Sequence, residues 1–240
     1  SSNSNGSITS SVSANTTAGF SIVSYTGNAT NGATVGHGLG AVPDMLIGKD
    51  LSDGSGWGIW HKNLSGATYR LAFTTDAQSN DSFLFGGSGN TLPTSTVFTL
   101  GSGGGLNGSN ANIVYAFTSI KGYSKYGSYI GGGSNPPFVY LGFKPAFFMV
   151  KPSSGTTGGW TMYDNAREPV NDGSFGVLTA NSNNQELTEL SSAIDFTSNG
   201  VKIRGGAGSS DNNASGATYI YMAFAESPFV TSSGVPTVAR

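Results

Sequence analysis

The sequence predicts an all-β protein made of two tandem modules, each a β-sandwich or jelly roll of about 105 residues, packed closely together. The first observation behind this prediction is the composition: only 10% of the residues are charged, while 37 are glycine. The charged side chains that cover the wet face of soluble helices are therefore scarce, whereas small polar, β-branched and aromatic residues suit strands and tight turns. The second observation is that the chain repeats itself.

The repeat is clearest where residues 39–49 (LGAVPDMLIGK) return without a gap as residues 141–151 (LGFKPAFFMVK). Shorter pairs keep the same order along the chain: 24–27 with 128–131, 56–60 with 159–163, 98–99 with 196–197, 107–109 with 213–215, and 116–117 with 223–224. A spacing of about 100 residues is too long for a solenoid repeat and matches one whole β-domain. The repeated residues are mostly glycine, proline, aromatic and aliphatic, which indicates selection for a fold.

The repeat divides the chain into four parts. We expect residues 1–18 to be an N-terminal arm or linker, because they contain few apolar residues. The first module then covers residues 19–125 and the second covers residues 126–231, joined through a short aromatic stretch that favours close packing. Residues 232–240 are expected to be a flexible tail.

Each module contains a series of strand-like segments separated by turn residues. Residues 45–47 form a short apolar run after Pro43, typical of a buried strand, and residues 69–73 alternate in a way typical of a half-buried strand. Only residues 184–190 favour a turn or two of helix. The expected strands are 20–25, 45–47, 57–60, 69–73, 82–85, 96–100 and 112–117 in the first module, and 138–141, 146–150, 160–163, 175–178, 194–196, 201–204 and 218–224 in the second.

Charge and cysteine content exclude several functional classes. The net charge of −2 gives no electrostatic attraction to nucleic acid or to an anionic membrane surface. No apolar run approaches the length needed for membrane insertion. The absence of cysteine excludes disulfides, thiolate catalysis and cysteine-type zinc sites.

No catalytic or metal-binding constellation is visible. His37 and His61 are expected at the surface or in turns, and the scattered carboxylates form no pattern for acid–base chemistry. The polar loop that contains Asp211 lacks the spacing of a calcium loop, so we expect no metal and no cofactor.

Aromatic residues are the remaining candidates for ligand contact, because ring faces can stack on sugars. Trp57 and Trp160 occupy equivalent positions in the repeat, which favours a role in the core for both. Exposed stacking is expected instead from aromatic residues near loops: Phe85, Tyr123 and Tyr126.

Several motifs of the chain carry a family resemblance. They lie at residues 19–28, 36–45, 57–62, 122–129, 142–147 and 213–221. Together they make the chain similar, over residues 19–230, to a domain of uncharacterised function found in tailed phages, especially marine ones. The resemblance implies a virion structural component, of the kind found among tail-fibre and other surface proteins. It implies no catalytic residues and does not distinguish a tail location from a capsid location.

We therefore expect a non-enzymatic phage virion structural protein, exposed at the virion surface as a fibre, adhesin or decoration module. It is expected to assemble with copies of itself, for example as a trimer, to attach to other virion proteins through residues 1–18, and to contact host surface glycans. One alternative is a tandem carbohydrate-binding module of a larger surface protein or enzyme. A glycan depolymerase is a further alternative, disfavoured by the lack of an acid–base pair.

Overall fold

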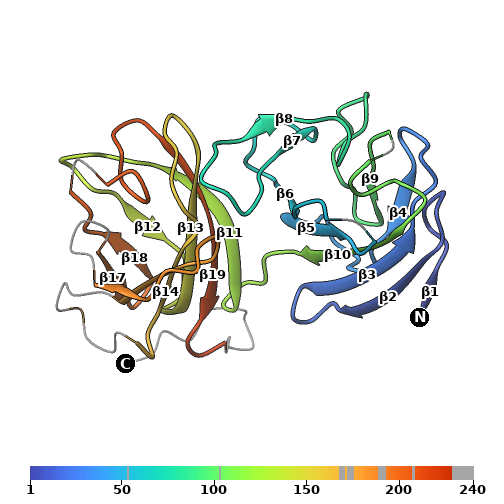
Figure 1. Cartoon of the computed structure of the whole chain (residues 1–240). Helices are drawn as coiled ribbons and strands as arrows, with labels where there is room; N and C mark the ends of the chain where they lie inside the picture. The colour runs from blue at the N-terminus through green and yellow to red at the C-terminus, as the bar shows by residue number, and fades with distance from the viewer. Residues whose placement is uncertain are drawn as a thin grey trace. The chain divides into compact units, whose positions relative to one another are not determined.

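The computed structural model describes residues 1–52, 54–102, 104–167, 171, 176–188, 193–206 and 209–228, and this part of the chain is all-β, without a helix (Figure 1). It forms two compact units. Unit 1 contains Ser1–Ala72 and Gln78–Thr118, and unit 2 contains Phe73–Ala77 and the chain from Ser119 onward. The all-β prediction is confirmed.

Unit 1 is built on a six-stranded antiparallel sheet in the order β1-β2-β3-β10-β5-β6. Two small two-stranded sheets, β4–β9 and β7–β8, accompany it. The strands are β1 (Ser2–Asn3), β2 (Ser10–Asn15), β3 (Phe20–Thr26), β4 (Thr34–Gly36), β5 (Met45–Asp50), β6 (Gly58–His61), β7 (Tyr69–Arg70), β8 (Ser79–Asn80), β9 (Val97–Thr99) and β10 (Ala111–Phe117).

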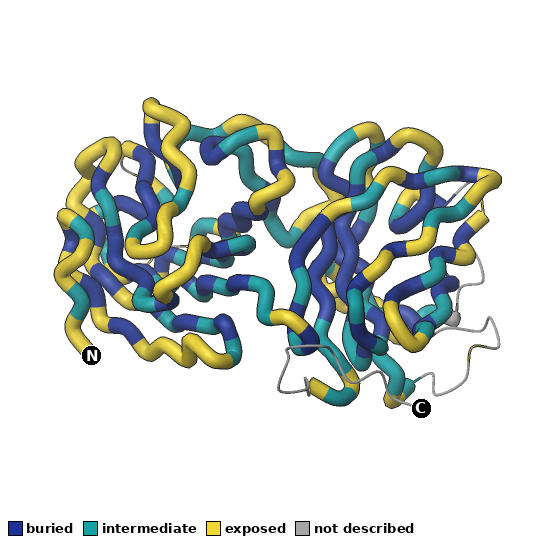
Figure 2. Tube along the Cα trace, turned by 180° about the vertical axis from the view of Figure 1, so that it is seen from behind, coloured by how far each residue is buried: buried dark blue, intermediate teal, exposed yellow. Residues whose placement is uncertain are grey.

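The core of unit 1 lies between the six-stranded sheet and the β4–β9 sheet. Val23 and Val114 of the large sheet, and Val35 and Phe98 of the small one, are all fully buried. The rings of Tyr25 on β3 and Phe98 on β9 have centroids 6.1 Å apart, so the two sheets meet there. Along β3 and β10 every second residue is buried, and Figure 2 shows buried positions in dark blue along the chain.

Unit 2 has a six-stranded sheet in the order β11-β19-β13-β14-β15-β16 and a three-stranded sheet in the order β12-β18-β17. Their inner faces share one apolar cluster, with Phe148, Val150 and Tyr221 from the large sheet and Ile194 and Val201 from the small one. Two sheets packed around one core make a β-sandwich. The strands are β11 (Ser124–Ile130), β12 (Phe138–Tyr140), β13 (Pro145–Ser154), β14 (Thr161–Asp164), β15 (Gly176–Thr179), β16 (Leu187–Thr188), β17 (Ile194–Thr197), β18 (Gly200–Ile203) and β19 (Thr218–Ala225).

The large sheets of the two units repeat one topology. The order β3-β10-β5-β6 in unit 1 corresponds to β11-β19-β13-β14 in unit 2. Gly27 follows β3 and Gly131 follows β11, and in both places a Cβ atom would lie about 2 Å from a backbone carbonyl oxygen, of Gly108 and Ala214 respectively. Only glycine fits such an approach, which explains why this residue recurs in the sequence repeat.

Unit 2 includes the short segment Phe73–Ala77, which is held by Lys151 and Gly158. The buried Lys151 Nζ donates hydrogen bonds to the carbonyl oxygens of Asp76 and Gly158, both at 2.7 Å. Gly158 N donates to Thr75 O at 2.9 Å. Burial lowers the pKa of Lys151 to about 8, because the ammonium group loses its hydration.

The N-terminal arm expected over residues 1–18 is instead part of unit 1. β2 pairs with β3 from Ser11 opposite Ser24 to Asn15 opposite Phe20. Val12 is buried, so a single large apolar side chain is enough to hold this short polar strand against the sheet.

Other boundaries in the structure also differ from those predicted from the sequence. Unit 1 ends at Thr118, not at residue 125, because β11 begins at Ser124 and pairs with β19 in unit 2. In the segment where a helix was expected, Leu187 and Thr188 form β16, while residues 189–190 lie outside the described part of the chain. The expected tail, residues 232–240, also lies outside it.

Candidate functional site

A cavity of about 260 Å³ in unit 1 combines aromatic rings with a charged pair. We call it the Trp57–Phe83 pocket. The side chains that give it chemical character are Trp57, Arg70, Asp81 and Phe83.

Trp57 and Phe83 provide the apolar walls. Trp57 stands just before β6 and is half-buried, with its ring stacked on Tyr115 of β10 at a centroid distance of 6.3 Å and an interplanar angle of 27°. Phe83 is 59% exposed, an unusual degree for a large apolar side chain. Its backbone N donates to Asp81 Oδ1 at 3.0 Å, an Asx-type turn that holds the phenyl ring away from the core.

Arg70 and Asp81 provide the polar wall. Arg70 ends β7, and its Nε donates to Asp81 Oδ2 in an ion pair. The side chains are 33% and 19% exposed, so both remain accessible to a ligand. The guanidinium keeps further N–H donors, and the carboxylate keeps further lone pairs, beyond those used within the pair.

Glycines keep the pocket open. Gly104 and Gly105 both adopt positive φ, at 54° and 56°. A Cβ at Gly105 would lie 2.3 Å from Leu84 Cδ2, whereas one at Gly104 would meet nothing within 4 Å. Gly104 and Gly105 therefore give this part of the pocket a backbone wall without side chains.

Two aromatic side chains beside an ion pair offer the two kinds of contact that a sugar needs. The C–H face of a pyranose packs on an aromatic ring, and its hydroxyl groups accept from guanidinium and donate to carboxylate. The pocket is also of a size suited to a single sugar unit.

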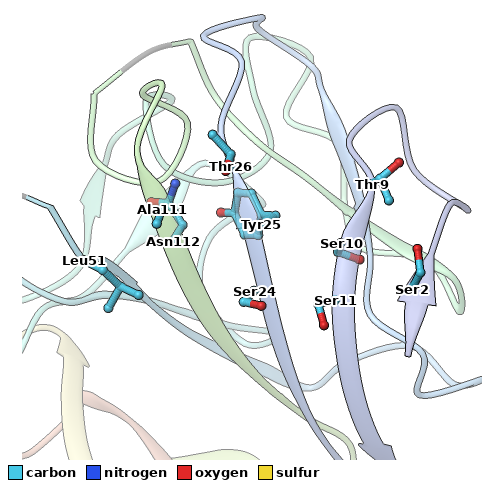
Figure 3. Close-up of a pocket in the computed structure, with 10 residues that line it drawn as sticks. All are labelled: Ser2, Thr9, Ser10, Ser11, Ser24, Tyr25, Thr26, Leu51, Ala111 and Asn112. Atoms are coloured by element: carbon cyan, nitrogen blue, oxygen red, sulfur yellow. The ribbon is translucent and has the colours of Figure 1, made fainter.

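A larger depression of about 450 Å³ lies at the end of the six-stranded sheet of unit 1 (Figure 3). Ser2, Ser11 and Ser24 stand directly opposite one another across β1, β2 and β3 and form a row of hydroxyl groups. Tyr25 also lines it, but this residue is only 6% exposed and its hydroxyl donates to Leu106 O at 2.8 Å. Among the described residues that line this depression, none carries a charge and none offers an open ring face, so it is the weaker candidate.

The aromatic residues expected to contact glycans do not form a site. Phe85 is 3% exposed and packs edge-on against Phe98 in the core of unit 1. Tyr126, in unit 2, is 2% exposed. Tyr123 is half-buried, with its ring 5.8 Å from Phe224. The expectation that these three rings are exposed is therefore wrong for Phe85 and Tyr126, because both are buried.

The aromatic residues of the pocket were hard to identify from the sequence. The sequence repeat predicts a core position for both Trp57 and Trp160. Trp160 is only 2% exposed, but Trp57 lies just before β6 and is half-buried. Phe83 and Phe85 would share one face of a strand, yet the chain turns between them, so one is exposed and the other buried. The flanking glycines, Gly56 and Gly58, were the available signal, because glycine cannot cover a neighbouring ring.

His37 and His61 are fully buried, so the expectation that they lie at the surface is wrong. His37 Nδ1 accepts from Leu39 N at 3.2 Å, and Nε2 lies 3.1 Å from Thr94 O, a pattern that fits the neutral ring protonated on Nε2. Burial lowers the pKa of His37, because the charged ring would lose hydration. His61 Nδ1 accepts from Asn63 N at 3.1 Å. Both rings serve as turn-stabilising acceptors.

The polar loop weighed as a calcium ligand has a structural role. Asn213 Nδ2 donates to Gly133 O and Gly205 O, and Asp211 Oδ1 accepts from Gly159 N. In the described part of the chain no group of three or more His, Asp or Glu side chains could hold a metal ion. In the same part no helix is long and apolar enough to cross a membrane.

Comparison with known proteins identifies the family. No curated protein and no solved structure matches the chain. One family, described as a domain of unknown function and named DUF7483, matches residues 1–228, so a single match spans both units. The chain therefore belongs to the DUF7483 family of domains.

Proposed function

We propose that this protein is a non-enzymatic, glycan-binding structural protein of a phage virion, exposed on the particle and binding host surface sugars through the Trp57–Phe83 pocket. The observation that supports glycan binding is the convergence of Trp57, Phe83 and the Arg70–Asp81 pair on one cavity. The virion location rests on the motif resemblance described from the sequence.

The arrangement favours binding over catalysis. Among the described residues, the pocket lining contains a single carboxylate, Asp81, which is joined to Arg70 in an ion pair, whereas glycoside hydrolysis ordinarily uses a pair of carboxylates. Sugar recognition needs no such pair, because ring stacking and hydrogen bonds supply the affinity.

Screening the purified protein on a glycan array tests the binding proposal. We expect saturable binding to a limited set of glycans and recovery of each bound glycan uncleaved. Absence of binding to every glycan, or release of new reducing ends, would contradict it.

The virion proposal has a separate test. An antibody raised against the purified protein should label intact phage particles from the source in electron micrographs, at regular positions. Labelling confined to cell material or to a large secreted enzyme would support the alternative of a carbohydrate-binding module instead.

A further inference from the structure

The outer face of the three-stranded sheet in unit 2 carries two exposed aromatic rings on one edge strand. Phe138 and Tyr140 of β12 are 45% and 61% exposed, whereas Val139 between them is 4% exposed. Strand alternation therefore points both rings to solvent, about 7 Å apart along the strand. This edge is labelled β12, beside β18, in Figure 1.

Register places polar residues beside these rings. Phe138 stands opposite Lys202, which stands opposite Asp195, so the three form one row across β12, β18 and β17. Tyr140 stands opposite Gly200 in the next row. A Cβ at Gly200 would lie 2.8 Å from Phe138 Cζ, so glycine is what allows the phenyl ring to lie over the sheet.

The polar groups around the rings are mainly cationic. Lys125 Nζ donates to Tyr140 O at 2.7 Å and lies 5.2 Å from the centre of the Tyr140 ring. Lys202 Nζ donates to Pro136 O. Arg204, 54% exposed, forms an ion pair with Asp195 at 2.7 Å. Three cations against one carboxylate leave an excess of positive charge here, although the whole chain has a net charge of −2.

We infer that this surface, the Phe138–Tyr140 shelf, is a second binding site, and that its ligand is an acidic polysaccharide such as a polyuronate. The two rings would stack on sugar rings of an extended chain that runs along β12, the edge strand of its sheet. Lys125, Lys202 and Arg204 would then attract the carboxylates of the sugars. The charge distinguishes it from the Trp57–Phe83 pocket, where the single cation is matched by a single carboxylate.

This inference goes beyond the proposed function and stands without it, because the two sites share no residue. Affinity electrophoresis in gels that contain either alginate or neutral dextran of matched length tests it. We expect retardation by alginate alone, and weaker retardation as salt is added, because exposed charges are screened.

Variants locate the site. Tyr140→Ala should weaken alginate binding roughly fivefold through the loss of one stacking ring, and Arg204→Gln should weaken it and reduce its salt dependence. Leu92→Ala, which removes an exposed apolar side chain of unit 1, should bind alginate as the wild type does, and Lys121→Gln, which alters an exposed lysine, is the matched charge control. Thermal unfolding of each variant confirms that it is folded. Equal retardation by alginate and dextran, salt-independent retardation, or unchanged binding by Tyr140→Ala and Arg204→Gln would each overturn the inference.

Discussion

Asn213 in unit 2 makes the same hydrogen bonds as Asn107 in unit 1. Each side chain is fully buried, and each Nδ2 donates to two backbone carbonyls, of Thr30 and Gly101 for Asn107 and of Gly133 and Gly205 for Asn213. Each Oδ1 accepts from a backbone N two residues beyond a sheet strand. The neighbouring tyrosines agree as well, since Tyr25 donates to Leu106 O and Tyr129 donates to Asn212 O.

This likeness supports the prediction of two tandem modules. The family match treats residues 1–228 as one domain, so the duplication stays a prediction. If the two units are equivalent, Asn107 and Asn213 should contribute similarly to stability.

Asn107→Ala and Asn213→Ala should each lower the free energy of unfolding by about 3 kcal/mol, because buried backbone groups lose their partners. Denaturant unfolding followed by circular dichroism measures the effect. Asn80→Ala, at an exposed position of β8, is the control and should change stability little. A much smaller effect in one unit than in the other would argue against equivalent roles.

Acid should destabilise the protein through His37. Its folded-state pKa is lowered, so the unfolded chain takes up a proton first as the pH falls below the usual value of 6.5. Stability contributed by the neutral ring is therefore complete above that pH and decreases below it, by at most about 1.4 kcal/mol per pH unit. Denaturant unfolding at a series of pH values should show a shallower loss for His37→Gln, which keeps a donor for Thr94 O. An identical acid profile for the variant would refute this role.

Alkali should have the opposite effect through Lys151. Its pKa is lowered from 10.5 to about 8, so between these values the unfolded chain binds a proton that the folded chain has lost. Stability should therefore rise with pH across this interval. Comparison with Lys151→Met separates this contribution from other titrating groups, because the variant should lack the rise. A wild-type profile parallel to that of the variant would show that the amine is not titrating there.

The Arg70–Asp81 pair should be needed for glycan binding. Arg70→Met removes charged donors from the pocket wall and should weaken binding roughly tenfold. Lys62→Met, which breaks the Lys62–Asp44 pair elsewhere in unit 1, is the matched control and should bind as the wild type does. Titration calorimetry with a glycan selected on the array measures both. Equal losses for the two variants would indicate a general effect of charge.

The sequence was informative where a residue has one physical role in both repeats. Gly27 and Gly131 recur because a side chain cannot fit there, and Ala116 and Ala223 recur as fully buried positions of paired strands. The all-β class followed from these same residues together with the low charge.

The candidate site was poorly predicted because exposure depends on where the chain turns. Phe85 and Tyr126 lie near loops in the sequence, yet both are buried, while Phe83 is turned outward by its hydrogen bond to Asp81. Arg70 and Asp81 are eleven residues apart in the sequence, and their side chains meet because β7 pairs with β8. Such contacts leave no periodic signal in a single sequence.

The most direct test of glycan binding at the Trp57–Phe83 pocket is titration calorimetry of Phe83→Ala against Leu92→Ala with the selected glycan. Phe83 and Leu92 are 59% and 58% exposed, so each variant removes a similarly exposed apolar side chain from unit 1, but only Phe83 lines the pocket. We predict that Phe83→Ala weakens binding roughly fivefold or more, while Leu92→Ala leaves it unchanged. Wild-type affinity in Phe83→Ala would contradict the account.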